Sequence, residues 1–252
     1  MIFAAGLGTR LKPLTDTVPK ALVPVAGKPL LEHIVLKLKA AGFDEIIVNV
    51  HHFAEQIIDF FKEKNNFDIR IEISDETDRL LDTGGGIKRA AAFFDDGKPF
   101  LLHNVDIISN VDLRRMYDFS LKKNALATLL VSKRHTSRYL LFDKQNRLAG
   151  WLNETTKEVK SPYPTLNPND YSKLAFAGIH VLSPAIFKYM NDWSGKFSIV
   201  DFYLSIADTC TIEGYTQTGL QALDVGRNYP VVAADMLSDR SFIQSEQNYV
   251  EP

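Results

Sequence analysis

The first half of the chain alternates short apolar runs with amphipathic segments, which restricts the folds available to it. Four apolar runs predict strands, at residues 1–5, 45–50, 69–73 and 99–103. Three segments between them carry apolar residues at helical spacing and predict helices, at residues 29–41, 53–64 and 85–94. Strands that alternate with helices pair in parallel through right-handed crossovers. The sequence therefore predicts an α/β fold with a mostly parallel central sheet flanked by helices.

The second half continues with a less regular pattern. Further strands are predicted at 127–132, 139–142, 148–152, 174–182, 211–216 and 220–224, the second and third forming a hairpin. Further helices are predicted at 111–123, 184–190 and 198–207, with a last one starting near Tyr229. The proline-rich segment 161–169 predicts an exposed loop. The length of 252 residues suits one large domain.

A glycine-rich segment, GLGTRLKPLTDTVPK at residues 6–20, directly follows the first predicted strand. Gly6 and Gly8 bracket a turn in which a Cβ would crowd both the backbone and a ligand. Such a loop can direct successive backbone N–H groups at a phosphate. Arg10 adds a planar, permanently charged group, and two prolines stiffen the chain that leads to Lys20. The segment therefore predicts a polyphosphate site.

Two common phosphate-binding loops do not match this segment. The dinucleotide fingerprint requires a third glycine where Leu11 stands. The other loop has Lys and Ser or Thr after its last glycine, whereas Thr9 and Arg10 follow Gly8. A purely structural turn is the alternative, but such a turn would not require the two basic residues.

Carboxylates follow the ends of two predicted strands. Asp106 ends the segment HNVD after a buried strand, and Asp224 lies in LDVG after another. A carboxylate in such a place is costly unless it is solvated, paired or bound to a metal. The alternative is that each caps the helix that follows. Because ligands gather at the carboxyl ends of parallel strands, segments 6–20, 75–86 and 104–106 are expected at one edge of the sheet.

The glycine-rich segment resembles the G-x-G-T-R-L-x-P-L-T run ending in P-K that marks the sugar-nucleotide nucleotidyltransferases. The matching residues are Gly6, Gly8, Thr9, Arg10, Leu11, Pro13, Leu14, Thr15, Pro19 and Lys20. The resemblance extends to about Tyr229 and is weakest over residues 134–173. It implies one nucleotidyltransferase domain over 1–252, with a Rossmann-like α/β fold and a mixed, mostly parallel central sheet flanked by helices. The nucleotide-binding half would span 1–110, the sugar-phosphate-binding half 111–240 and a frayed tail 241–252, with no C-terminal β-helix.

The resemblance also implies roles for individual residues. Arg10 and Lys20 would be catalytic, and Mg²⁺ would be held by Asp106 and Asp224. The nucleotide would be bound by Ala5, Gly6, Gly8, Thr9, Arg10, Lys20, Glu76, Gly84 and Gly85. The sugar phosphate would be bound by Asn104, Glu154 and Gly178. The reaction would join a nucleoside triphosphate to a sugar 1-phosphate and release pyrophosphate.

The substrates are less defined than the reaction. The triple glycine 84–86 after a carboxylate resembles N-acetylmuramate-1-phosphate uridylyltransferases and some mannose- or heptose-1-phosphate guanylyltransferases. Asp75 or Glu76 stands where relatives read the base, and a carboxylate suits guanine or uracil, so UTP and GTP stay open. The family's E-K-P element is altered here. Lys157 and Arg227 are candidate replacements for its lysine, and a solvated charged loop around Glu154 is the alternative.

The amino-acid composition excludes some classes of partner and indicates where the protein acts. A formal net charge of −2 without a basic stripe argues against nucleic acid. The single cysteine excludes a disulfide within the chain and suits a reducing cytoplasm. No apolar run is long enough to predict a membrane span, so a cytoplasmic protein is expected. Without a C-terminal β-helix, a monomer or homodimer is expected. Two other functions are alternatives to nucleotidyl transfer. One is a glycosyltransferase, which would need a D-x-D motif where Asn104 and Asp106 stand, and the other is a non-catalytic sugar-nucleotide sensor.

Overall fold

The computed structural model describes residues 1–227 and 229, and the chain divides into two compact units. The described part of the first unit consists of residues 1–80, 103–114, 221–227 and 229. The second unit consists of Leu81–Leu102 and Arg115–Leu220. Both units are discontinuous in sequence, whereas the predicted halves at 1–110 and 111–240 are continuous. The helix predicted from near Tyr229 and the tail 241–252 lie outside the described residues, apart from Tyr229 itself.

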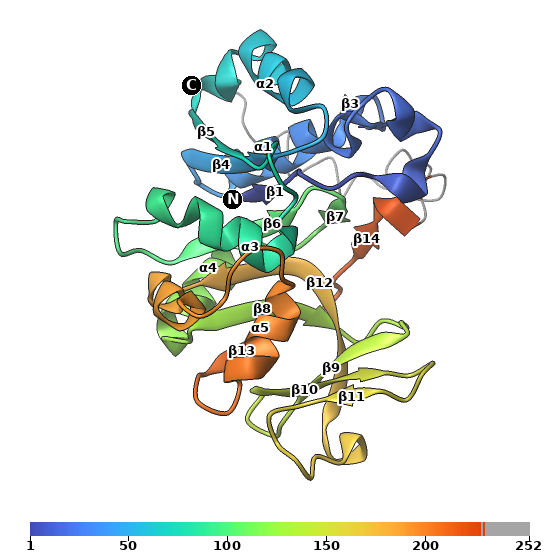
Figure 1. The fold of residues 1–252 in the computed structure, drawn as a ribbon, viewed down its shortest axis with the longest axis vertical. Coiled ribbons are helices and arrows are strands. Elements are labelled where there is room, and N and C mark those ends of the chain that lie inside the picture. The colour runs from blue at the N-terminus through green and yellow to red at the C-terminus, as the bar shows by residue number, and fades with distance from the viewer. Residues whose placement is uncertain (228, 230–252) are drawn as a thin grey trace. The chain divides into compact units, whose positions relative to one another are not determined.

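The main sheet of the first unit is parallel (Figure 1). Its strands, in spatial order, are β6 (Phe100–Asn104), β1 (Ile2–Phe3), β4 (Glu45–Val50) and β5 (Arg70–Asp75). Of β6, only His103 and Asn104 belong to the first unit. Ile2 pairs with Val48 on one side and with His103 on the other. β1 is shorter than the predicted strand 1–5 because the Ala4 N–H donates to the side chain of Asn49, 2.7 Å away.

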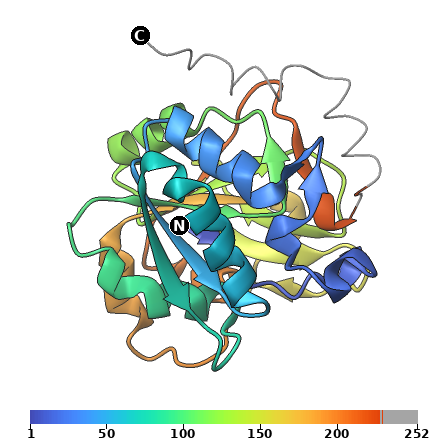
Figure 2. The same cartoon turned by 90° about the horizontal axis from the view of Figure 1, so that it is seen from above.

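Two helices of the first unit pack their apolar side chains into its core, and one of them also contacts the turn that carries Lys20. α1 (Leu30–Ala40) packs against the 3-10 turn Lys20–Leu22. α2 (Ala54–Glu63) packs against β5 (Figure 2). Its buried side chains include Ile57, Phe60 and Phe61. Each fully buried side chain of this size contributes about 1.5–3 kcal/mol of transfer free energy. Because α1 contacts the turn that carries Lys20, this turn is held by a packed helix.

Two small antiparallel ladders complete the first unit. β2 (Pro24–Val25) pairs with β3 (Lys28–Pro29), and β7 (Ile107–Ser109) pairs with β14 (Ala222–Asp224). In the second ladder Asp224 lies opposite Ile107. This register brings the C-terminal LDVG segment beside the HNVD segment, from which it is separated by more than a hundred residues in sequence.

The second unit has a mixed sheet. Its strands, in spatial order, are β13 (Ile212–Tyr215), β8 (Ala127–Ser132), β12 (Ser172–Leu182), β9 (Arg138–Phe142), β10 (Leu148–Asn153) and β11 (Val159–Lys160). Only the β8–β13 pair is parallel among these. The predicted hairpin is confirmed as β9 and β10. The short strand β11 was not predicted, because its two residues give no alternating pattern.

The helices of the second unit are close to the predictions but differ at their ends. They are α3 (Asp82–Arg89), α4 (Leu113–Lys123), which begins in the first unit, and α5 (Ile199–Ile206). The predicted start at Gly85 was wrong, since α3 begins at Asp82 and continues as the 3-10 turn Ala90–Phe93. Pro184–Met190 is a 3-10 helix. The α/β class is confirmed, and no helix in the described ranges is long and apolar enough to cross a membrane.

Candidate functional site: a phosphate loop beside two carboxylates

The glycine loop after β1 has a fixed shape. Gly8 has φ of 66°, and a Cβ there would lie 2.8 Å from Thr15 Cγ2 and 3.0 Å from Lys20 Cβ. Its carbonyl accepts hydrogen bonds from Leu11 N at 2.8 Å and from Thr15 Oγ1 at 2.9 Å. Gly8 is therefore required by the conformation of the loop. A Cβ on Gly6 would meet no described atom within 4 Å, which leaves its backbone open to a ligand.

A buried polar pair holds the start of this loop. Asn49 Oδ1 accepts from the N–H groups of Ala4, at 2.7 Å, and Ala5, at 3.3 Å. Asn49 Nδ2 in turn donates to Glu76 Oε1 at 2.7 Å, and Glu76 has no exposed surface. The sequence analysis missed Asn49, although an amide in the apolar run EIIVNV was a usable signal. The contact predicted between Glu76 and a base stays a prediction.

Three of the predicted residues meet at Gly226. Lys20 Nζ forms an ion pair with Asp106 Oδ2, and the two side chains are only 15% and 14% exposed. A Cβ placed on Gly226 would lie 3.2 Å from Asp106 Oδ2, 3.2 Å from Asp224 Oδ1 and 3.3 Å from Lys20 Nζ. The Val225 N–H also donates to the Asp106 carbonyl at 2.9 Å. Lys20, Asp106 and Asp224 thus form one cluster, called the Lys20 cluster below.

The electrostatics of the Lys20 cluster favour an additional cation. Burial raises the pKa of Asp224, the negative charge of Asp106 raises this pKa further, and Lys20, Arg227 and Arg10 oppose the rise. Asp224 Oδ1 is buried and has no hydrogen-bond partner within the described ranges. Its other oxygen forms an ion pair with Arg227 Nε, 3.2 Å away. A cation near Asp224 Oδ1 would therefore satisfy an acceptor that the protein leaves unpaired.

The donor set also fits Mg²⁺. Among residues 1–227 and 229, no group of three or more His, Cys, Asp and Glu side chains is arranged to hold a metal. Mg²⁺ commonly uses only one or two carboxylates and takes its other oxygens from water and substrate phosphates. Asp106 and Asp224 match that habit.

The remaining predicted residues of the first unit lie on the loop or at the end of a strand. Thr9 and Arg10 are exposed and belong to the 3-10 turn Thr9–Leu11. The positive charge of Arg10 is the smallest of the three that oppose the rise in the pKa of Asp224. Asn104 is half-buried at the end of β6 and pairs with Phe3, the last residue of β1. The glycine loop therefore begins next to Asn104, because β1 and β6 end side by side.

The predicted glycines of the second unit have packing reasons of their own. A Cβ on Gly84 would lie 2.3 Å from the ring of Phe197, and one on Gly85 would lie 2.4 Å from the carbonyl oxygen of Gly195. Gly84 N also donates to Phe197 O at 2.9 Å. Gly178 has φ of 73° within an irregular stretch of the β12–β8 pairing. Contacts of these glycines with a base or a sugar stay predictions.

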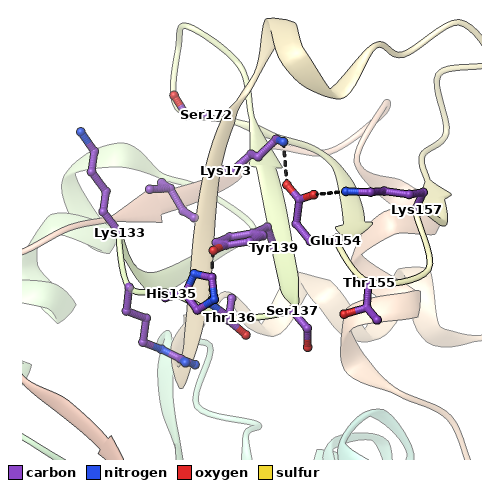
Figure 3. A pocket seen from close by; sticks show the side chains of 12 residues that line it. Lys133, His135, Thr136, Ser137, Tyr139, Glu154, Thr155, Lys157, Ser172 and Lys173 are labelled. Carbon is purple, nitrogen blue, oxygen red and sulfur yellow. Dashed lines mark hydrogen bonds and ion pairs between the residues drawn. The ribbon is translucent and has the colours of Figure 1, made fainter.

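Glu154 lies between two lysines (Figure 3). Its Oε2 accepts from Lys157 Nζ at 2.8 Å, and its Oε1 accepts from Lys173 Nζ at 2.7 Å. These hydrogen bonds, first from Lys157 and then from Lys173, lower the pKa of Glu154 to about 2. Of the two candidate replacements for the family lysine, Lys157 pairs with Glu154 and Arg227 pairs with Asp224. The sequence analysis did not single out Lys173.

A glycine loop with an arginine, a lysine and two carboxylates beside it defines a site suited to polyphosphates and a divalent cation. The model of the family described as nucleotidyl transferase matches residues 1–211. The chain therefore belongs to the nucleotidyl transferase family.

Individual relatives agree with the family. The N-acetylmuramate alpha-1-phosphate uridylyltransferase of Caulobacter vibrioides is 47% identical over 110 residues, 43% of this chain and 45% of that protein. The mannose-1-phosphate guanyltransferase of Yarrowia lipolytica is 32% identical over 190 residues, 74% of this chain and 49% of that protein. The matches thus span about half the length of these curated relatives.

The fold also matches a solved structure. A putative glucose-1-phosphate thymidylyltransferase from Bacillus anthracis, crystallised with sucrose, superposes with a TM-score of 0.76 at 16% identity. The superposition covers 100% of this chain and 96% of that one. At this identity the likeness supports the fold alone.

Proposed function

We propose that this protein transfers a nucleotidyl group from UTP or GTP to a sugar 1-phosphate and releases pyrophosphate. The observation that carries the proposal is the meeting of Lys20, Asp106 and Asp224 around Gly226, in the same unit as the glycine loop. The family of the chain and the activities after which its relatives are named support the same reaction.

The proposed nucleotidyl transfer depends on positive charges around the phosphates and does not require a strong general base. A phosphate oxygen of the sugar 1-phosphate attacks the α-phosphorus of the triphosphate. A new P–O bond forms, and the bond to the β-phosphate breaks with its electron pair leaving on pyrophosphate. The attacking oxygen is already ionised at neutral pH, so catalysis consists of aligning two anions and neutralising their charge.

Each part of the first unit has a role in this proposal. The N–H groups and open backbone around Gly6 and Gly8 would bind the triphosphate, with Arg10 on its oxygens. Lys20 would neutralise charge on the reacting phosphates. Asp106 and Asp224 would hold Mg²⁺, which when bound supplies positive charge for phosphate oxygens. We propose that the protein acts in the cytoplasm as a monomer or homodimer.

The test is a matrix of triphosphates against sugar 1-phosphates, using the full chain with MgCl₂ or with EDTA. Pyrophosphate is detected by a coupled assay, and the NDP-sugar is identified by mass spectrometry. The proposal predicts stoichiometric pyrophosphate and NDP-sugar, with loss of both in EDTA. A glycosyltransferase would instead consume an NDP-sugar and release a nucleoside diphosphate. A sensor would bind the nucleotide or sugar nucleotide without turnover, and either result would refute the proposal.

A further inference from the structure

Three strands of the first unit end side by side (Figure 1). In the register of this sheet, Phe3 of β1 lies opposite Asn49 of β4, and Asn49 lies opposite Ser74 of β5. Strand β1 leads into the glycine loop, and β5 leads into Glu76. Asn49 therefore stands between the loop that would bind the triphosphate and the carboxyl group that follows β5.

The side chain of Asn49 connects these two neighbouring segments. Its Oδ1 accepts from the Ala4 and Ala5 N–H groups, and its Nδ2 donates to Glu76 Oε1. Asn49 is only 3% exposed, so water does not replace a lost hydrogen-bond partner there. Turning the amide over would set its NH₂ group against two N–H donors and its oxygen against a carboxyl oxygen. Glu76 therefore fixes which way round the amide of Asn49 lies.

Glu76 is itself held in place through its backbone. Its N–H donates to the Val50 carbonyl at 2.8 Å, and its carbonyl accepts from Arg79 N at 3.0 Å and from His51 Nδ1 at 2.6 Å. The residue has no exposed surface. A base could touch the Glu76 side chain only if the surrounding residues moved, whereas the contact with Asn49 is already formed.

The glycine loop is held at both of its ends. Asn49 fixes the peptide groups that lead into Ala5, and at the far end the Gly8 carbonyl accepts from Thr15 Oγ1. Ala5 is buried, whereas Gly6, the next residue, is exposed. Glycine imposes little conformational restraint of its own. A change in the orientation of Asn49 would therefore redirect the backbone that Gly6 presents to a ligand.

We propose that Asn49 and Glu76 are positioning residues for the triphosphate. Glu76 sets the orientation of the Asn49 amide, and Asn49 sets the direction in which Gly6 presents its backbone. The inference rests on the proposed function, which places the triphosphate on this loop, and it gives Glu76 an indirect role instead of a contact with the base. Because the pair acts on the phosphate loop, its loss should weaken UTP and GTP by the same factor and leave KM for the sugar 1-phosphate unchanged.

Exchanging the two functional groups gives the sharpest test. Asn49→Asp keeps an acceptor for the Ala4 and Ala5 N–H groups. It also sets a second carboxyl group against Glu76, and two carboxylates in contact repel each other. Glu76→Gln keeps an acceptor for the Asn49 amide. The double variant Asn49→Asp/Glu76→Gln restores one donor and one acceptor between the two side chains, with both lengths unchanged.

Ser74→Ala is the matched control. Ser74 lies opposite Asn49 and is 3% exposed, and its hydroxyl has no hydrogen-bond partner within residues 1–227 and 229. Removing the hydroxyl therefore changes a buried neighbour of the pair without breaking a hydrogen bond.

Isothermal titration calorimetry on the full chain with MgCl₂ measures Kd for UTP and for GTP, pyrophosphate release gives kcat and KM, and urea unfolding shows which variants are folded. Asn49→Asp should raise both Kd values about tenfold or more, and the double variant should return them to within about threefold of the wild type. Glu76→Gln and Ser74→Ala should each change Kd by less than about threefold, equally for the two nucleotides. If Asn49→Asp does not fold, Glu76→Asp replaces it, because the shorter side chain withdraws the acceptor from Asn49, and Kd should rise about threefold or more.

The inference is overturned if the folded Asn49→Asp variant binds both triphosphates as tightly as the wild type, or if the folded double variant does not recover the affinity. It is also overturned if Glu76→Gln changes the ratio of the UTP and GTP dissociation constants, because Glu76 would then contact the base. Failure of the proposed function gives a different result: the triphosphates bind and respond to the variants as expected, but no sugar 1-phosphate supports pyrophosphate release. If the wild type binds neither triphosphate, both the proposed function and the inference are wrong.

Discussion

Replacing Lys20 with alanine tests the Lys20 cluster most directly. The variant removes the cation that contacts Asp106 and leaves Asp106 and Asp224 to repel each other. If Lys20 neutralises the reacting phosphates, its loss should lower kcat about 10²–10³-fold, the range seen when one electrostatic stabiliser is removed. The free energy of unfolding should fall by an amount between about 1 kcal/mol, as for an exposed pair, and about 3–5 kcal/mol, as for a fully buried one.

A second substitution separates the two effects. In Lys20→Ala/Asp106→Asn both charges of the pair are gone, so part of the lost stability should return, while activity should stay low. Lys12→Ala is the control, because it breaks an exposed pair with Asp16 in the same segment, at 3.1 Å with side chains 61% and 49% exposed. The control should change stability by less than about 1 kcal/mol and leave turnover unchanged.

Pyrophosphate release and urea unfolding measure the two quantities on the same preparations. The reasoning is refuted if Lys20→Ala retains wild-type kcat. It is also refuted if restoring stability in the double variant restores activity, since Lys20 would then be structural.

Three further predictions concern other features of the molecule. Gly226→Ala inserts a methyl group 3.2–3.3 Å from all three members of the Lys20 cluster and should lower turnover about 10²-fold, with thermal unfolding showing little loss of stability. Gly84→Ala should destabilise the protein by about 1–3 kcal/mol in urea, because its methyl overlaps the Phe197 ring, and Phe197→Ala in the same chain should recover part of the loss. Burial lowers the pKa of His103 to about 3, so the folded state keeps it neutral. Keeping His103 neutral does not lower the free energy of unfolding above the unfolded pKa of 6.5. Between pH 6.5 and about 3, the free energy of unfolding should fall by about 1.4 kcal/mol per pH unit, because the unfolded chain binds a proton that the folded chain does not. His103→Leu should make this pH dependence smaller, as measured by urea unfolding at several pH values.

The fold was predictable because its signals are local. Apolar runs and helical periodicity located α1, β4 and β8 to within a residue or two. The parallel pairing of β1, β4, β5 and β6 followed from the alternation of strands and helices in the first half of the chain. The ends of elements depend on distant partners. β1 stops early because Asn49 captures the Ala4 N–H, and α3 extends through its glycines because Phe197 and Gly195 require a close approach. The sequence pattern around β1 and α3 therefore does not predict where either element ends.

The candidate site was predictable to a similar depth. The motif positions of Lys20, Asp106 and Asp224 pointed to one cluster. The β7–β14 ladder brings Asp224 next to the segment of Asp106, and Lys20 forms an ion pair with Asp106. Neither Asn49 nor Lys173 was anticipated, because each acts through a hydrogen bond to a carboxylate far away in sequence. Spacing along the chain predicts neighbours within an element and says little about partners of that kind.

The glycines of the motifs divide by the reason for having no side chain. Gly8 needs its left-handed conformation and the space that Thr15 fills, and Gly84 needs the space that Phe197 fills, so both are explained within the folded chain. Gly6 has neither reason, because its φ is not in the left-handed region and no described atom lies within 4 Å of the Cβ position. Glycine also loses more backbone entropy on folding than any other residue. A glycine with that cost and no internal explanation is best accounted for by a molecule that approaches its backbone from outside, which is what a triphosphate on this loop would do.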